Sequence, residues 1–183
     1  GQLIQFLSSH EVGHTLRLRH NFGSSSTVPV EKLRDKNWVA ENGHTPSIMD
    51  YARFNYVAQP EDKLTRKELF ARIGDYDNWA IEWGYRLFPE FKSADAEKAK
   101  LNSWVIEKLK NRRLWWGDGE MSQDDSRNQT EDLGDDAMKA SMYGIKNLQR
   151  VIPNLMEWTK EENKDYEGLQ QMYNQVSGQF SRY

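Results

Sequence analysis

The sequence of 183 residues contains no cysteine, so it can form neither disulfide bonds nor a metal site with thiolate ligands. It also lacks an apolar run approaching the roughly 20 residues of a membrane-spanning helix. The net charge of −3 leaves no excess of basic residues, which nucleic-acid-binding proteins usually carry on one face. These absences argue against thiolate chemistry, a membrane span in this chain and a nucleic-acid partner.

Signals for β-strands are weak throughout, and no internal repeat or low-complexity tract is visible. Apolar residues instead recur at helical spacing in several segments. Aromatic residues make up 12% of the chain, with seven tryptophans and eight tyrosines, enough to build a dense core despite a low mean hydropathy. We therefore expect a mainly α protein, with a polar loop over 121–131 and with helices over residues 2–16, 30–40, 65–70, 75–88, 94–114, 135–152 and 165–180.

The first predicted helix carries a pattern that is typical of zinc sites. His10 and His14 are four residues apart, which puts both imidazoles on one helical face, one turn apart. Two neutral imidazoles in this arrangement can share a zinc ion, and Glu11 between them can serve as the base for a zinc-activated water. His20 follows six residues after His14, so the helix must end and the chain must turn back. A third histidine then leaves one coordination position open, as catalytic zinc sites do.

The run from His10 to His20 resembles the pattern H-E-x-x-H-x-x-G-x-x-H of the metzincin class of zinc metallopeptidases. One position departs from it, because Arg17 stands where the pattern has glycine. Glycine suits that position since the chain bends sharply there and can require a positive φ. Another residue adopts the left-handed conformation at a cost of ~1 kcal/mol. The placement of His20 therefore depends on Arg17 adopting it.

A second stretch, residues 45–51, resembles the methionine-containing turn that metzincins place beneath the metal. The resemblance assigns Met49 to the structural floor of the site rather than to the ligands. Tyr51 stands two residues later, where some metzincins have a tyrosine that reaches the metal or the oxyanion of the reaction. Asp50 is a candidate partner for the second ring nitrogen of a metal-bound histidine. His44 precedes the turn, and we expect it to be solvent-exposed or to stabilise the turn rather than to bind metal.

The wider sequence closely resembles the bacterial Met-zincin family, whose members are largely uncharacterised secreted proteins. The resemblance covers nearly the whole chain and is carried by residues 20–22, 47–51, 73–77, 80–86, 130–136, 139–141 and 143–148. It implies the C-terminal half of a metzincin-like catalytic domain, with residues 1–88 forming the zinc-binding part and residues 89–183 a helical extension packed on it. The β-sheet subdomain that precedes the metal helix in metzincins would belong to the missing N-terminal part of the same polypeptide.

This resemblance implies a secreted zinc metalloendopeptidase that acts on protein or peptide substrates in the periplasm or outside the cell. Glu11 would accept the proton of the water, and Tyr51 would donate to the oxyanion. The expected Zn²⁺ ligands are His10, His14 and His20. We expect the intact protein to be an enzyme and this chain alone to have little or no activity, because it lacks an edge strand that aligns substrate.

The alternative is a non-catalytic helical binding module, or pseudo-peptidase, that retains the zinc motif. Pseudo-enzymes commonly lose the glutamate or a ligand histidine, and this chain retains all of them. The retention favours an enzyme in the intact protein.

Three other groups have simpler structural interpretations. Acidic residues over 132–136 suit the positive N-terminal end of the helix that follows; a calcium site is the alternative, although their spacing matches no calcium-binding loop. Apolar stripes at helical spacing usually indicate core, methionine included. That interpretation applies to Trp79, Ala80, Trp83 and Leu87 in one predicted helix and to Met138, Met142, Ile145, Leu148 and Ile152 in another.

Overall fold

The computed structural model describes residues 1–121 and 124–183, so two residues of the predicted loop over 121–131 lie outside the described residues. Within these residues the chain is helical or irregular, and the one extended pairing is an isolated bridge between Phe54 and Phe70. The prediction of a mainly α fold is confirmed. The helices are α1 (Gln2–Thr15), α2 (Lys36–Asn42), α3 (Asp75–Tyr85), α4 (Ala94–Lys108), α5 (Ala137–Val151), α6 (Leu155–Thr159) and α7 (Glu167–Arg182).

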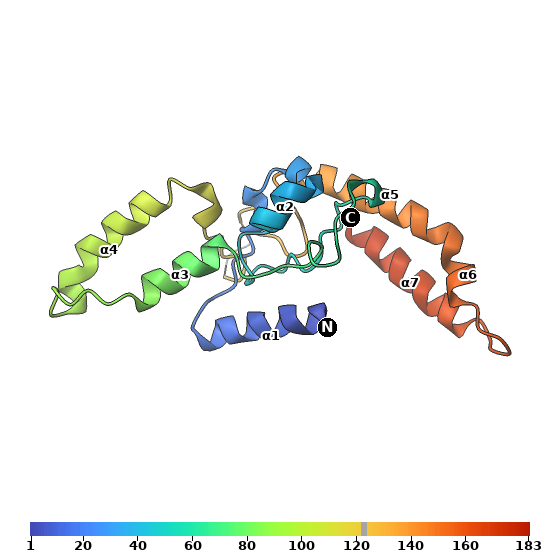
Figure 1. Cartoon of the computed structure of the whole chain (residues 1–183), viewed down its shortest axis with the longest axis horizontal. Helices are drawn as coiled ribbons and strands as arrows, with labels where there is room; N and C mark the ends of the chain where they lie inside the picture. The colour runs from blue at the N-terminus through green and yellow to red at the C-terminus, as the bar shows by residue number, and fades with distance from the viewer. Residues whose placement is uncertain (122–123) are drawn as a thin grey trace.

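The arrangement has a central body with a helical arm on each side (Figure 1). The body holds α2 and the long irregular segments, and α1 runs along one edge of it. One arm is formed by α3 and α4, and the other by α5, α6 and α7. No helix among the described residues combines the length and the apolar character needed to cross a bilayer.

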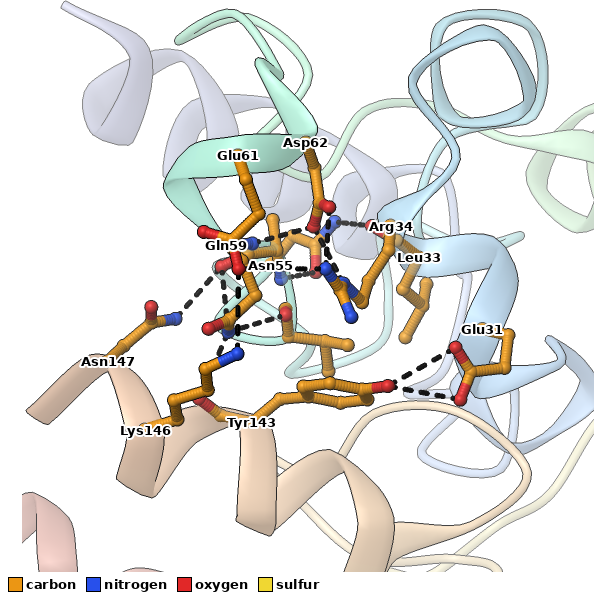
Figure 2. Close-up of polar contacts among 12 residues, drawn as sticks. Glu31, Leu33, Arg34, Asn55, Gln59, Glu61, Asp62, Tyr143, Lys146 and Asn147 are labelled. Carbon is orange, nitrogen blue, oxygen red and sulfur yellow. Dashed lines mark hydrogen bonds and ion pairs between the residues drawn. The ribbon is translucent and has the colours of Figure 1, made fainter.

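The main core lies in the central body and includes residues from both halves of the sequence. Its buried members come from irregular segments, from the 3-10 turn Val30–Arg34 and from α5: Val28, Val30, Leu33, Ala52, Val57, Leu133 and Ala140. Polar contacts join α5 to the body beside this cluster (Figure 2). Asn147 donates its amide to the carbonyls of Tyr56 and Ala58, 2.9 Å away in each case, and Gln59 donates to the carbonyl of Tyr143 at 3.1 Å. The predicted boundary between residues 88 and 89 stays a prediction.

Several predicted helix boundaries differ from the structure for local reasons. The predicted helix over 30–40 is divided into a 3-10 turn, Val30–Arg34, and α2, because Asp35 caps α2 by accepting the Trp38 N–H at 3.1 Å. The predicted helix over 65–70 is wrong, since this segment forms turns that lead into the bridge at Phe70.

Asp136 caps α5 by accepting the Lys139 N–H at 3.0 Å, and Asp135 accepts the Val30 N–H at 2.8 Å. These contacts favour the capping interpretation of the acidic run over a calcium site.

The core interpretation of the apolar stripe of α5 is wrong for its methionines and for Ile152, which is 48% exposed, whereas Ile145 and Leu148 are half-buried. Met138 and Met142 are 82% and 69% exposed, whereas Ala140 and Gly144 on another face are buried. The small residues let the helix approach its neighbours closely: a Cβ on Gly144 would lie 2.4 Å from the ring of Tyr183. The side of α5 that faces inward is thus the one whose small residues permit close packing, and not the one with the longer apolar side chains.

The core interpretation of this stripe is confirmed for Trp79, and Ala80 is half-buried. It is wrong for Trp83 and for Leu87, which lies beyond the end of α3; both are exposed. Trp79 packs edge-to-face on Trp104 of α4, with ring centroids 4.8 Å apart. The two-helix arm covers only one side of α3, so the other side faces solvent.

Candidate metal centre

Helix α1 orients its two histidines through their Nδ1 atoms. His10 Nδ1–H donates to the carbonyl of Ile48 at 2.8 Å, and His14 Nδ1–H donates to the carbonyl of Leu18 at 3.0 Å. A carbonyl oxygen can only accept, so the hydrogen of each neutral ring lies on Nδ1. The Nε2 atom of each ring is therefore left with a free lone pair, which is the form that binds a metal ion.

The end of α1 turns the chain back, as the position of His20 requires. Leu18 N–H bonds to the carbonyl of Gly13 at 3.0 Å, and Arg17 N–H bonds to that of His14 at 2.9 Å. These two bonds form a Schellman motif, whose residue after the cap adopts the left-handed conformation. Arg17 occupies that position with φ of 63°. Arg17 thus adopts the conformation for which the motif usually has glycine.

The reversal brings His20 onto the other two imidazoles. Its Nε2 lies 3.2 Å from Nε2 of His10 and 3.2 Å from Nε2 of His14. Its Nδ1–H donates to the carboxylate of Glu120, so this Nε2 also has a free lone pair. Within the described residues, these three side chains are the one set of potential ligands whose donor atoms lie close enough to hold a metal, all within 4.8 Å.

The donor set fits zinc. Two nitrogens that each lie about 2.05 Å from a tetrahedral zinc ion are about 3.3 Å apart, close to the separations found here. Three converging lone pairs without a hydrogen between them repel one another unless a cation or a proton joins them. Three imidazoles also leave a fourth position for water or substrate.

Burial supports the neutral form of His10, which is 3% exposed. Loss of solvent lowers the pKa of this imidazole, and charge on the neighbouring His14 and His20 lowers it further. The hydrogen bond to Ile48 acts in the opposite direction. A ring that stays unprotonated is ready to bind a cation.

Glu120 is a site residue that the sequence analysis missed. It belongs to a segment after α4 that wraps around the third histidine: Trp116 Nε1–H donates to the carbonyl of His20 at 2.9 Å, and Gly117 N–H donates to the side chain of Asn21 at 2.9 Å. Arg19 adds an ion pair with Asp118 at 3.1 Å. No spacing rule connects residues 20 and 120, so only the tertiary structure identifies this carboxylate.

Met49 lies directly beneath α1 and is fully buried. A Cβ on Gly13 would stand 2.3 Å from its sulfur, so the side chain occupies the space that the glycine leaves. The Met49 carbonyl accepts the Asn21 N–H at 3.1 Å, which ties this turn to the segment after His20. Met49 therefore packs directly against α1 at Gly13, and its role as the floor of a metal site stays a prediction.

Tyr51 and Glu11 flank the three histidines. The ring of Tyr51 lies 4.8 Å from that of His20 and 5.5 Å from that of His10, measured between centroids. Glu11 is on the exposed side of α1, between the two helical histidines in sequence. Of the two, the Tyr51 ring is in contact with the imidazoles, and Glu11 is exposed on the helix that carries His10 and His14.

The expected role of Asp50 is wrong. All three Nδ1 atoms have other partners, and Asp50 is buried with one oxygen accepting the Ser25 N–H at 2.7 Å and the Thr45 hydroxyl at 3.1 Å. His44 is also buried, so the solvent part of its interpretation is wrong. Its Nε2–H donates to the carbonyl of Ala52 at 2.6 Å, which agrees with a turn-stabilising role. Burial lowers the pKa of His44 to about 4.

Comparison with known proteins gives one family. A family model described as Met-zincin matches residues 1–183. No curated protein and no solved structure matches the chain. The match covers every residue of the metal centre, Glu120 included.

Proposed function

This chain belongs to the Met-zincin family, and we propose from that premise that it carries the catalytic zinc site of a metallopeptidase. The observation that carries the proposal is the convergence of three unprotonated imidazole nitrogens at separations of 3.2 Å. In a histidine cluster formed by chance, nothing would require all three Nδ1–H groups to donate hydrogen bonds to protein acceptors. The family name and the donor geometry support the same chemistry.

In the proposed mechanism His10, His14 and His20 would hold the metal ion. Zinc bound there would supply a Lewis acid for activating a water molecule and polarising the scissile carbonyl. Glu11 accepts the proton of the attacking water and later delivers it to the leaving amine. Tyr51 donates a hydrogen bond to the developing oxyanion. Its ring packs against those of His20 and Phe22, with centroids 4.8 and 5.1 Å away.

The proposed substrate is a protein or peptide, and the proposed location is the periplasm or the cell exterior. We also propose that another part of the same polypeptide covers α1. Support comes from the apolar side chains that α1 leaves exposed, Leu3, Ile4, Leu7 and Val12. A surface of this kind on one helix is typical of a face that packs on another element. Substrate alignment would then depend on that element, and the chain alone would cleave poorly.

The test is zinc content of the purified chain by elemental analysis after zinc addition and removal of the excess. We expect about one zinc per chain, with strong loss in His20→Ala and full retention in Glu11→Gln. Peptidase activity of the intact protein should disappear in Glu11→Gln and persist in Glu157→Gln, an exposed glutamate of α6.

The outcomes separate the two candidate functions. Zinc bound without any Glu11-dependent hydrolysis in the intact protein would favour the pseudo-peptidase. Absence of zinc in the wild-type chain would contradict the proposal itself.

A further inference from the structure

Asp77 has a role that its position in the sequence does not reveal. It lies in the first turn of α3, and its side chain is buried among three donors. One carboxylate oxygen accepts the N–H groups of Ile48 at 2.7 Å and Gly74 at 2.8 Å, and the other accepts the hydroxyl of Ser47 at 2.7 Å. Among the described residues no ion pair with Asp77 is present. Directed hydrogen bonds therefore stabilise this carboxylate, while burial raises its pKa.

These bonds continue from Asp77 to the metal centre. Ser47 donates its only hydroxyl hydrogen to Asp77, so the lone pairs of the same oxygen accept the Met49 N–H at 3.0 Å. The peptide that carries this N–H has the carbonyl of Ile48 at its other end. That carbonyl accepts the Nδ1–H of His10 at 2.8 Å. A continuous chain of hydrogen bonds thus runs from carboxylate to hydroxyl, peptide and imidazole.

The direction of each bond is the same along this chain. Every donor points toward Asp77, so each bond polarises the next and strengthens it. Electron density is pushed toward the Ile48 oxygen, which makes it a better acceptor for the His10 ring. Carboxylates that accept from a metal-bound imidazole fix its orientation and raise its basicity. Asp77 acts on His10 in this way through a serine and one peptide group.

The Nδ1–H groups of the three imidazoles consequently have different kinds of hydrogen-bond acceptor. His20 donates directly to the carboxylate of Glu120, whereas His14 donates to the backbone carbonyl of Leu18. His10 also donates to a backbone carbonyl, but that carbonyl is connected to a carboxylate.

The N-terminus of α3 holds this arrangement against the turn. A Cβ on Gly74 would lie 2.1 Å from the carbonyl oxygen of Pro46, and the Tyr76 N–H donates to the same oxygen at 3.1 Å. The two backbones are therefore in direct contact.

We propose that Asp77 and Ser47 are positioning residues of the zinc site, which set the orientation and basicity of His10 through the Ile48–Met49 peptide. This inference rests on the proposed zinc site and extends it to residues outside the ligand set. Loss of either residue should weaken zinc binding without removing a ligand.

The test uses Ser47→Ala and Asp77→Asn in the full chain, with two measurements. The first is the zinc dissociation constant, by competition with a chelator of known affinity. We expect it to rise about tenfold in each variant, in the range found for partners of metal-bound histidines. The second is the chemical shift of the His10 Nδ1–H in the metal-free chain, by NMR. It should move in both variants, while the Nδ1–H of His14 serves as the internal reference and stays in place.

Asp35→Asn is the matched control, because Asp35 also caps a helix but has no connection to the histidines. It should lower the melting temperature without changing zinc affinity or either histidine signal. The proposal is overturned if Ser47→Ala, which removes a single hydroxyl, changes neither the His10 signal nor zinc affinity. The same conclusion follows if Asp77→Asn behaves as Asp35→Asn does. If the wild-type chain binds no zinc, the proposed function fails. The NMR signal of His10 in the two variants still decides whether the chain of hydrogen bonds connects Asp77 to His10.

Discussion

The body around the metal centre and the two helical arms are stabilised in different ways. Among the described residues, the buried polar and charged side chains all lie between residues 10 and 77. They include His44, Asp50 and Asn55 in the body, and Asp77 in the first turn of α3, where that arm meets the body. In contrast, α4 has no buried residue, and α7 buries only Val176. A helix satisfies its own backbone groups, but an irregular segment needs side-chain partners for them. The body therefore depends on specific buried polar contacts. The arms share such contacts where they join the body, and beyond those places they depend on a few apolar ones.

The largest expected effect is a pH dependence that arises in the body. His44 has a folded-state pKa of about 4 and an unfolded value of 6.5, so the unfolded chain takes up its proton first as the pH falls. The contribution of His44 to stability is full above pH 6.5 and is lost progressively toward pH 4, by about 3 kcal/mol. The measurement is the free energy of unfolding of wild type minus that of His44→Gln, from pH 8 to 4.

Taking the difference between these two proteins cancels the opposite contribution of buried acids such as Asp132, whose pKa is raised to about 7 by burial. A difference that stays constant over this range would mean that the pKa of His44 is the same in the folded and unfolded chains, which would contradict the prediction. No comparable pH effect is expected from substitutions in α7.

The next effect is that of a glycine-to-alanine substitution beside the body, at Gly13, to be compared below with the same substitution in α7. Gly13→Ala should destabilise the chain by about 2 kcal/mol, because the new Cβ overlaps the buried sulfur of Met49 and outweighs the gain in helix propensity. The measurement is chemical denaturation of the metal-free chain. Gly13→Ala combined with Met49→Ala should cost less than the sum of the single substitutions, since the two sites are in contact. Strict additivity would contradict the contact.

Arg17→Gly should stabilise the chain by about 1 kcal/mol, since it relieves the left-handed conformation at the end of α1. Zinc affinity should stay unchanged or improve slightly, because His20 keeps its position. Lys98→Gly in the interior of α4 is the control, and it should lose about 1 kcal/mol. A loss of stability in Arg17→Gly, measured by denaturation, would mean that the arginine side chain makes a contribution larger than the strain.

The smallest effect is expected in an arm. Gly178→Ala in α7 places a methyl group where nothing lies within 4 Å, so helix propensity alone decides the outcome. We expect a gain of about 0.5–1 kcal/mol, measured by thermal unfolding. A loss instead would show that the exposed face of α7 packs on something in solution, and would weaken the contrast between body and arms.

Local patterns allowed good predictions near α1. The helix, the shared face of His10 and His14, and the chain reversal at Arg17 all follow from interactions within a few residues. Predictions failed where packing partners are distant in sequence. Met138 and Met142 were predicted as core, but the tertiary structure turns Ala140 and Gly144 inward instead. Asp50 was predicted as a histidine partner, but the neighbouring Ile48 carbonyl occupies that role.

The sequence by itself determined the mainly α class and the three histidines of the candidate metal centre, because helical periodicity and helix termination are local properties of the chain. Only the tertiary structure decided what supports those histidines. Glu120 is 100 residues from His20, and Asp77 reaches His10 through a turn 29 residues away from it. Hydrogen-bond partners that far apart are brought together by the packing of whole segments. The spacing of residues along the sequence therefore does not predict which of them pair.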